Sequence, residues 1–369
     1  MPDVLLVSKP LAPPWHDSSK NLVRDLAGHM HRYTPVVLSR RGVELPLPRA
    51  RVEPIYGTTR SFSPALRDNA RVLARLLLGR RTDLWHFFFA PNPKSSHVAR
   101  AAVRIRRARS VQTVCSAPAP NVKLDEVLFA ERVVVLSEHT RQRFLAAGLA
   151  EERIRLIPPA IAALTPPSAA HARGLREQLG LPTDRPLVVY AGDLEFGRGA
   201  DLALEAHADL PRTLATELVM ACRAKTARAR ERERELRQRA AQLGVADSVR
   251  FLGETPRIHD LLAVADLVTL PTDTLYAKMD LPLVLIEAMS LERCVIVGAG
   301  TPAEELAAGG GAVCVATQRD AVSAATRRLI EDASERTLIG ARARKVVLCD
   351  YDPARMSECY ESLYDQLCA

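Results

Sequence analysis

The sequence is poor in aromatic side chains and in lysine, and it has no long hydrophobic run. Phe, Trp and Tyr make up 5% of the 369 residues, and only 7 of the 51 basic residues are lysine. No segment approaches the roughly 18 consecutive apolar residues that a membrane-spanning helix requires. The first residues lack the basic and apolar regions of a secretory signal. These absences argue against a membrane-embedded or secreted protein and favour a cytoplasmic one.

The cysteines exclude two further architectures. Seven cysteines are scattered along the chain, and no two of them form a C-x-x-C pair. A disulfide framework needs an even set of cysteines, and a structural zinc site needs paired ligands. We therefore expect reduced thiols, with neither a disulfide scaffold nor structural zinc.

What is present is the composition of a folded, basic protein. Apolar residues make up 47% and charged residues 25%, as in ordinary globular domains. The length suggests two domains. The net charge of +8 favours anionic ligands. No known nucleic-acid-binding motif gathers the basic residues, so no nucleic-acid partner is expected.

Short apolar runs alternate with amphipathic stretches through both halves of the chain. Continuous apolar runs of this length are typical of strands buried on both faces of a parallel sheet. The expected strands are residues 3–8, 35–39, 84–90, 111–115 and 133–137 in the first half, and 187–192, 217–222, 248–252, 267–270 and 294–297 in the second.

A change in composition divides the two halves. Residues 164–172 contain two prolines and few large apolar side chains, which is typical of a linker. We predict an α/β protein with an N-terminal lobe over residues 1–165, a linker over 166–184 and a C-terminal lobe over 185–350. Residues 351–369 form a final amphipathic helix. Ligands are expected at the carboxyl ends of the strands.

The strongest motif lies in residues 266–297, which contain the run LPLVLIEAM at 281–289. This segment resembles the nucleotide-sugar-binding segment of the glycosyl transferases group 1, a large family of retaining enzymes with the GT-B fold. Glu287 matches the second acid of the family's E-x7-E motif, which implies a hydrogen bond to the donor ribose. The backbone amides of Leu283 and Val284 would lie at a helix N-terminus, where phosphate binds.

The first acid of that motif is replaced. Met279 occupies its position, and Asp280 and Lys278 flank it. In the family, the first acid contacts the donor sugar. The resemblance leaves two alternatives: Asp280 takes this catalytic role from a shifted backbone, or the role is lost.

Residues 190–201, YAGDLEFGRGAD, resemble the first strand, loop and helix of the family's donor lobe. Gly192 and Gly199 would permit a tight turn and a close backbone approach. Arg198 stands where the family has a diphosphate-binding lysine, and a guanidinium can fill that role. Asp193 replaces a second family cation, and Lys225 could restore the charge.

Residues 249–255, VRFLGET, resemble the family's base-binding strand and turn. Leu252, Glu254 and Thr255 are therefore candidates for the base pocket. Such contacts come from the backbone, so the identity of the base is not readable from these side chains.

In the first half, residues 83–93 resemble a family strand that ends near the catalytic centre. His86 matches the first histidine of D-x-x-H-x-H, and Phe88 occupies the second. His86 is either a catalytic residue or a buried structural histidine.

Two further stretches are candidates for the acceptor side of the cleft. Residues 13–21 replace the family's glycine-rich loop, and residues 134–140 resemble V-V-x-S-x-x-T. Serines in these stretches could cap helices, or they could meet substrate. The candidates are His16, Asp17, Ser18, Ser19 and Ser137.

The resemblance implies a GT-B architecture, in which two Rossmann-like lobes face each other across a cleft and the C-terminal helix returns to the N-terminal lobe. It implies a retaining transfer of a sugar, a hexose in particular, from a nucleotide-diphospho-sugar, with UDP-sugars favoured, to a hydroxyl of a saccharide, glycolipid or natural product. No metal or other cofactor is expected, and peripheral contact with the inner membrane face stays open. The alternatives are a sugar-nucleotide epimerase, a pseudo-glycosyltransferase and a non-catalytic sugar-nucleotide-binding protein.

Overall fold

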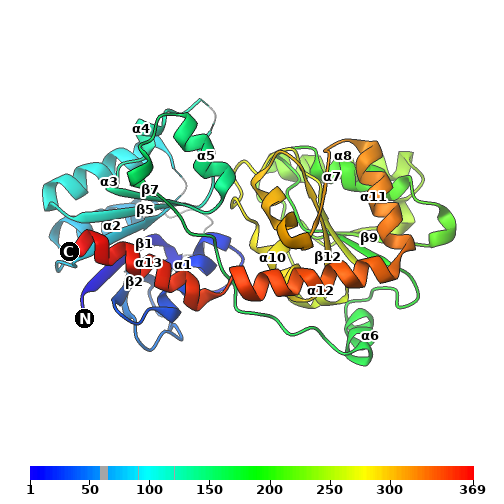
Figure 1. The fold of residues 1–369 in the computed structure, drawn as a ribbon, viewed down its shortest axis with the longest axis horizontal. Coiled ribbons are helices and arrows are strands. Elements are labelled where there is room, and N and C mark those ends of the chain that lie inside the picture. Colours follow the sequence, from blue (N-terminus) through cyan, green and yellow to red (C-terminus); the bar gives the residue numbers. More distant parts are fainter. Residues whose placement is uncertain (59–64, 90, 120) are drawn as a thin grey trace. The chain divides into compact units, whose positions relative to one another are not determined.

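The computed structural model describes residues 1–58, 65–89, 91–119 and 121–369. It contains two compact units (Figure 1). Unit 1 comprises Met1–Ala162, Tyr276–Asp280 and Tyr351–Ala369, and unit 2 comprises Ala163–Leu275 and Leu281–Asp350. The chain thus leaves unit 2 for the five residues 276–280 and returns, and its last helix belongs to unit 1.

Unit 1 is built on a parallel sheet of seven strands in the order β3-β2-β1-β4-β5-β6-β7. The inner strands are almost wholly buried because helices cover both faces, which is why they are continuous apolar runs. The strands are β1 (Asp3–Leu11), β2 (Thr34–Arg40), β3 (Arg51–Tyr56), β4 (Leu84–Phe88), β5 (Arg109–Val114), β6 (Arg132–Val135) and β7 (Ile154–Leu156).

Several helices of unit 1 start at residues whose side chains cap the first turn. Asp17 caps α1, Asn92 caps α3 and Ser137 caps α5, each by accepting from a first-turn amide. The final helix packs on α1. The helices are α1 (Ser18–His29), α2 (Leu66–Leu78), α3 (Pro93–Arg106), α4 (Leu124–Val127), α5 (Glu138–Ala146) and α13 (Pro353–Cys368), with a short 3-10 turn at Glu151–Arg153.

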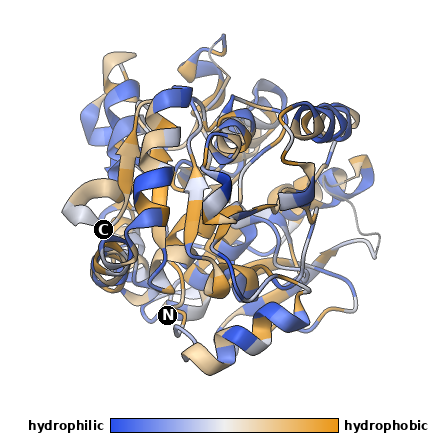
Figure 2. Cartoon of the chain, turned by 90° about the vertical axis from the view of Figure 1, so that its right-hand side faces the viewer, coloured by the Kyte–Doolittle hydropathy of each residue, from blue (hydrophilic) through white to orange (hydrophobic). Residues whose placement is uncertain are grey.

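Unit 2 is built on a second parallel sheet, of six strands in the order β10-β9-β8-β11-β12-β13. Figure 2 shows the strands as the most hydrophobic segments, while the helices alternate along their length. The strands are β8 (Leu187–Tyr190), β9 (Glu217–Met220), β10 (Val249–Phe251), β11 (Leu267–Leu270), β12 (Cys294–Gly298) and β13 (Val313–Val315).

The helices of unit 2 follow these strands in the usual β-α alternation. They are α6 (Ala169–Gln178), α7 (Gly199–Ala208), α8 (Ala227–Gln242), α9 (Ile258–Val264), α10 (Leu283–Ser290), α11 (Arg319–Glu331) and α12 (Ala333–Asp350), with 3-10 segments at Arg212–Leu214, Ala246–Ser248 and Pro302–Gly310. No described helix is long and apolar enough to cross a bilayer.

The expected strands form, and the predicted α/β class with two Rossmann-like parts is confirmed. Ala90, the last residue of one expected strand, lies outside the described residues. Three strands were not expected: β3, β7 and β13. β3 carries Pro54 and charged residues at a sheet edge, and β7 and β13 have three residues each, so none of them resembles a buried apolar run.

The stretch expected as a linker, 166–184, differs from that expectation because it contains helix α6. Ser168 caps this helix by accepting from the amide of His171. Its buried Leu175 and the ion pair between Arg176 and Asp266 (2.7 Å) fix it within unit 2, where it packs on α9. The residues after the prolines are rich in alanine and in other side chains that favour helix, so this part of the stretch is helical.

Candidate functional site

In each sheet, successive strands are first placed on one side of a starting strand and later on its other side. The position between these two sets of strands is the switch point of the sheet. In unit 2 this point lies between β8 and β11, whose residues Tyr190 and Thr269 are paired. The loops after these two strands leave neighbouring positions at the same edge. Open α/β sheets bind ligands at such a switch point, outside the carboxyl ends of the strands. This edge is therefore the candidate site of unit 2.

Glycines allow the two loops at this edge to pack together. A Cβ on Gly192 would lie 2.4 Å from the ring of Tyr190 and 2.5 Å from Leu270. A Cβ on Gly199 would lie 3.0 Å from Thr272. Gly197, which the sequence analysis did not single out, has a φ of +75° and no room for a Cβ beside Asp273. These positions favour glycine because a Cβ would crowd neighbouring side chains, and Gly197 also has a positive φ.

Arg198 lies on the exposed side of this loop at the start of α7. Its backbone amide donates to Asp273 Oδ1 at 2.9 Å, which joins the loop after β8 to the loop after β11. Its guanidinium belongs to an exposed residue. Arg198, a positively charged residue, precedes the positive end of the α7 dipole, so the electrostatic field at the start of this helix favours an anion.

The neighbouring helix α10 presents a second N-terminus. It begins after Pro282, and among the described residues no side chain caps its first amides. Leu283 is buried and Val284 is partly exposed. Both side chains are apolar, so the polar groups at this helix start are the backbone amides. Uncapped amides at a helix start require an acceptor from water or a ligand.

Glu287 lies one turn further along α10. Its side chain is 15% exposed, and its Oε1 is 3.3 Å from Nε2 of His259 on α9. No sequence motif indicated His259. Its contact with Glu287 joins α9 to α10 beside the candidate site.

The carboxyl ends of β9 and β10 add a third group of polar side chains. Arg223 Nη1 lies 2.8 Å from Glu254 Oε1, and both side chains are partly exposed. The predicted Leu252 and Thr255 lie in the same loop, where Thr255 Oγ1 accepts from the amide of Arg257. Lys225 is exposed just before α8. Arg223 was missed, although it is the first basic residue after a predicted strand.

Asp193 has a structural task in this loop. Its Oδ1 accepts from the amides of Glu195 (2.7 Å) and Phe196 (2.9 Å), and its carbonyl accepts from the hydroxyl of Tyr190. Such a side-chain turn fixes the shape of the loop. The residue that replaces a family arginine therefore shapes the turn.

Asp280 belongs to unit 1, not to the edge of unit 2. Its side chain is 1% exposed and accepts from Ser137 Oγ at 3.0 Å, and its amide donates to the carbonyl of Cys115. Met279 is buried beside it, and Lys278 is partly buried. Both of these hydrogen bonds lie inside unit 1, and the contact of Asp280 with a donor sugar stays a prediction.

His86 is a core residue. Its Nδ1 lies 2.6 Å from the hydroxyl of Tyr364 and its Nε2 lies 2.7 Å from Thr113 Oγ1, and the ring is fully buried. Burial holds the pKa of His86 well below its ordinary value, so the ring is neutral. The structural alternative therefore describes His86, and the predicted catalytic role has no support. The ring of Phe88 packs against it, tilted by 36°, with the centroids 3.8 Å apart.

The loop after β1 holds the remaining candidates. Asp17, rather than either serine, caps α1: its Oδ1 accepts from the amide (3.1 Å) and the hydroxyl (2.6 Å) of Ser19. Its Oδ2 pairs with Lys9 Nζ at 2.6 Å. Ser18 is the first residue of the helix. His16 is partly exposed beside them.

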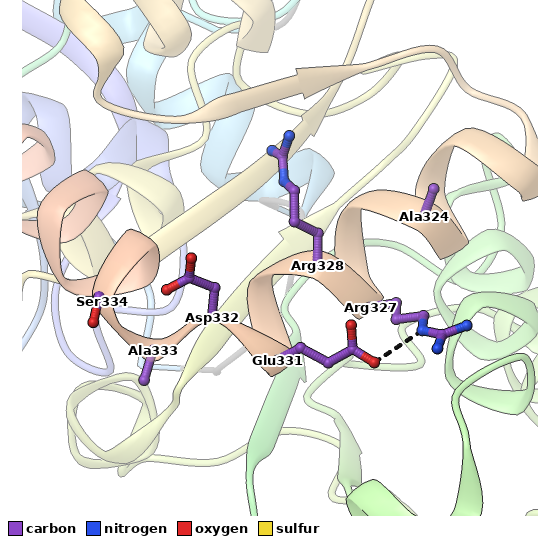
Figure 3. A pocket seen from close by; sticks show the side chains of 7 residues that line it. All are labelled: Ala324, Arg327, Arg328, Glu331, Asp332, Ala333 and Ser334. Atoms are coloured by element: carbon purple, nitrogen blue, oxygen red, sulfur yellow. Dashed lines mark hydrogen bonds and ion pairs between the residues drawn. The ribbon is translucent and has the colours of Figure 1, made fainter.

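A hollow of 740 Å³ lies elsewhere on unit 2 (Figure 3). Its walls come from the end of α11 and the start of α12, and α11 runs back from the carboxyl edge of the sheet. The ion pair between Arg327 and Glu331 (2.9 Å) lies on its wall. None of the predicted residues lines it. Among the described residues, no group of three or more His, Cys, Asp or Glu is arranged to hold a metal ion.

The two sheets, their strand orders and their loops at the carboxyl edges define a GT-B fold. HepE from Anabaena, solved in complex with UDP and glucose, superposes with a TM-score of 0.80 over 99% of this chain and 100% of its own, at 19% identity. Sucrose-phosphate synthase from Thermosynechococcus elongatus superposes with a TM-score of 0.76 at 19% identity, over 100% of this chain and 99% of its own. At this identity the likeness concerns the fold.

The sequence of unit 2 is similar to a known family. Residues 173–346 match the model of the family Glycosyl transferases group 1, the family that the sequence motifs resemble. D-inositol 3-phosphate glycosyltransferase from Xylanimonas cellulosilytica is 30% identical over 195 residues, which are 50% of this chain and 43% of that protein. The enzyme of the same name from Acidothermus cellulolyticus is 34% identical over 158 residues, 40% and 34% of the two chains. The matches thus span less than half the length of these curated relatives.

Proposed function

We propose that the protein is a retaining glycosyltransferase, which moves a sugar from a nucleotide-diphospho-sugar to an acceptor hydroxyl. The observation that carries the proposal is the carboxyl edge of unit 2. There the start of α7 with Arg198 and the uncapped start of α10 flank the same switch point, and Glu287 lies one turn into α10. This edge offers positive potential for a diphosphate and a carboxylate for vicinal hydroxyls.

The chemistry to be accelerated is departure of the nucleoside diphosphate. The bond between the anomeric carbon and the phosphate oxygen breaks, and the acceptor oxygen bonds to that carbon on the same face. The acceptor proton passes to the departing phosphate oxygen. Negative charge on the diphosphate grows in this transition state, so Arg198, Arg223 or Lys225, and the α10 amides act where the charge develops. These groups supply the positive potential without requiring a metal.

UDP-sugars are the first donors to test. HepE, which shares the fold, has been solved with UDP-glucose. The curated relatives of unit 2 act, by name, on D-inositol 3-phosphate. A phosphorylated cyclitol is therefore a sensible first acceptor, alongside saccharide, glycolipid and natural-product hydroxyls.

One observation favours a second candidate function. Met279 replaces the first acid of the family's motif, and Asp280 beside it is buried and accepts from Ser137 Oγ. A chain that binds the nucleotide sugar but does not transfer the sugar, or that epimerises it, would fit this loss.

Turnover by matched variants tests the proposal. Glu287→Ala and Arg198→Ala each remove a charged hydrogen bond of about 1.5–3 kcal/mol and should lower turnover at least about tenfold. Arg230→Ala, an exposed change on α8, is the control and should leave turnover unchanged. NMR of the product should show the anomeric configuration of the donor.

Two outcomes would contradict parts of this assignment. Activity within twofold of wild type for both variants would remove the edge of unit 2 from the reaction. Donor binding with no transfer to any acceptor, or an epimerised donor without acceptor, would favour the second candidate.

A further inference from the structure

The positive charge of the protein is concentrated in one segment. Residues 66–109 contain eleven Lys and Arg against two Asp and Glu, a net charge of +9. The whole chain carries +8, so the remaining residues together carry −1. The segment comprises α2, β4 and α3 of unit 1. The basic character that favours anionic partners is therefore a local property of this part of unit 1.

The two helices of this segment turn one face to the core and one to solvent. Val72, Leu73, Leu77 and Val103 pack on the buried cluster beneath them. The solvent-facing side of α2 and α3, which we call the α2–α3 outer face, carries exposed residues at helical spacing. They are Leu66, Arg67, Ala70, Arg71, Ala74 and Leu78 on α2, and Lys94, His97, Val98, Ala101, Arg104 and Ile105 on α3.

Large apolar side chains lie exposed on this face. Leu66 is 85% exposed, Leu78 84%, Ile105 69% and Val98 49%. None of the twelve described positions of the outer face is acidic. The one acid of α2, Asp68, accepts from the amide of Gly57 and from Arg71. Leucine and isoleucine exposed beside basic side chains form a costly surface for a protein that contacts only water.

The two helices form one continuous surface. They pack against each other, and Arg106 of α3 donates to the carbonyls of Leu77 (2.7 Å) and Gly79 (3.1 Å) at the end of α2. Three exposed arginines, Arg80, Arg81 and Arg107, follow at this end. Arginines near the last carbonyls also stabilise the helix ends, but that role does not account for the apolar side chains.

We propose that the α2–α3 outer face binds the surface of an anionic lipid bilayer. Exposed apolar side chains on such helices enter the boundary between headgroups and acyl chains, and basic side chains pair with lipid phosphates. Single-stranded nucleic acid would require aromatic side chains for stacking, and none of the outer-face positions is aromatic. This inference is independent of the proposed sugar transfer.

Helix α8 of unit 2 provides a matched control. It has six arginines, but three glutamates oppose them, with ion pairs from Arg232 to Glu235 and from Arg237 to Glu233 (2.7 Å). No large apolar side chain of this described helix is exposed. It is thus rich in arginine without being a basic, apolar surface.

Sedimentation with vesicles tests the proposal. The full chain should bind phosphatidylglycerol vesicles at least about tenfold more tightly than phosphatidylcholine vesicles. Raising the salt from about 0.1 M to about 1 M should weaken the binding, since the Debye length falls from about 10 Å to about 3 Å. The double variants Arg67→Gln/Arg104→Gln and Leu78→Ser/Ile105→Ser should each weaken it at least about tenfold. The α8 variant Arg230→Gln/Arg234→Gln should bind like wild type.

Several results would overturn the proposal. They are no binding to phosphatidylglycerol vesicles, equal binding to both lipids, an equal loss in the α8 variant, and tighter binding to a DNA duplex than to the vesicles. All variants change exposed side chains, so a thermal unfolding scan should show them folded. Sugar-nucleotide binding, measured without vesicles, should be the same in all of them, so failure here is distinguishable from failure of the proposed function.

Discussion

The carboxyl edges of the two sheets use their charged residues differently. At the edge of unit 2, Arg198, Arg223 and the starts of α7 and α10 keep polar groups at the surface. In unit 1, Asp280 is buried against Ser137 and Asp17 caps a helix while pairing with Lys9. The edge of unit 2 is thus suited to an external anion. In unit 1, Asp280 and Asp17 form hydrogen bonds and an ion pair that stabilise the fold. Substitutions should separate the two kinds of role.

The largest effect on stability is expected from a buried acid of unit 1. Glu361 on α13 is 1% exposed and accepts from the backbone amides of His31, Arg32 and Tyr33. Glu361→Ala leaves three backbone donors without this acceptor, of which the amide of Tyr33 is buried, and should lower the unfolding free energy by about 3 kcal/mol or more. Urea unfolding measures this, with the exposed Glu358→Ala as control. Equal midpoints for the two variants would contradict the structural role of Glu361.

Asp280 should give the next largest effect. Asp280→Ala removes the acceptor of the buried Ser137 hydroxyl and should destabilise the protein by about 2 kcal/mol. The affinity for a sugar nucleotide should stay within about twofold, well under the tenfold that 1.4 kcal/mol would cause. A large loss of donor affinity with unchanged stability would reverse this assignment and restore Asp280 to the donor site.

A pH titration compares one buried histidine from each unit. Burial holds the pKa of His86 well below 6.5 and lowers that of His207 to about 4. The unfolded chain therefore binds more protons than the folded chain below pH 6.5, so stability is complete above that pH and falls on acidification. Between pH 6.5 and 5.5 each histidine should contribute a loss of about 1 kcal/mol.

The matching variant is His207→Gln. Urea midpoints between pH 6.5 and 5.5 should fall less steeply in this variant than in wild type, and the slope that His86 causes should persist. An identical slope in the two proteins would show that His207 does not titrate in this way.

The smallest effect on stability is expected at the edge of unit 2. Arg223 and Glu254 form a partly exposed ion pair, which contributes about 0–1 kcal/mol. Arg223→Ala should therefore change the unfolding free energy little, while weakening the binding of a sugar nucleotide several-fold. Calorimetric titration of the folded variant separates the two. A destabilisation as large as that of Asp280→Ala would place Arg223 among the structural charges.

The sequence predicted the edge of unit 2 better than that of unit 1, for a physical reason. Glycine positions and a helix start depend on local backbone geometry, which spacing reveals, so Gly192, Gly199 and Leu283 lie where expected. The environments of His86 and Asp280 depend on partners far along the chain, Tyr364 and Ser137. The spacing of residues within a short segment of sequence does not predict such contacts. His259 and Asp273 were missed for the same reason.

The most direct test of the central claim is thermal unfolding with UDP-, GDP-, TDP- and ADP-sugars, for wild type, Arg198→Ala and the α8 control Arg230→Ala. A ligand at about 100 times its dissociation constant adds about 2.7 kcal/mol to the folded state, a clear shift in Tm. We expect one nucleotide class to raise Tm in wild type and in the control, with EDTA making no difference, and a much smaller rise in Arg198→Ala. The absence of any shift, or equal shifts in all three proteins, would contradict a sugar-nucleotide site at the carboxyl edge of unit 2.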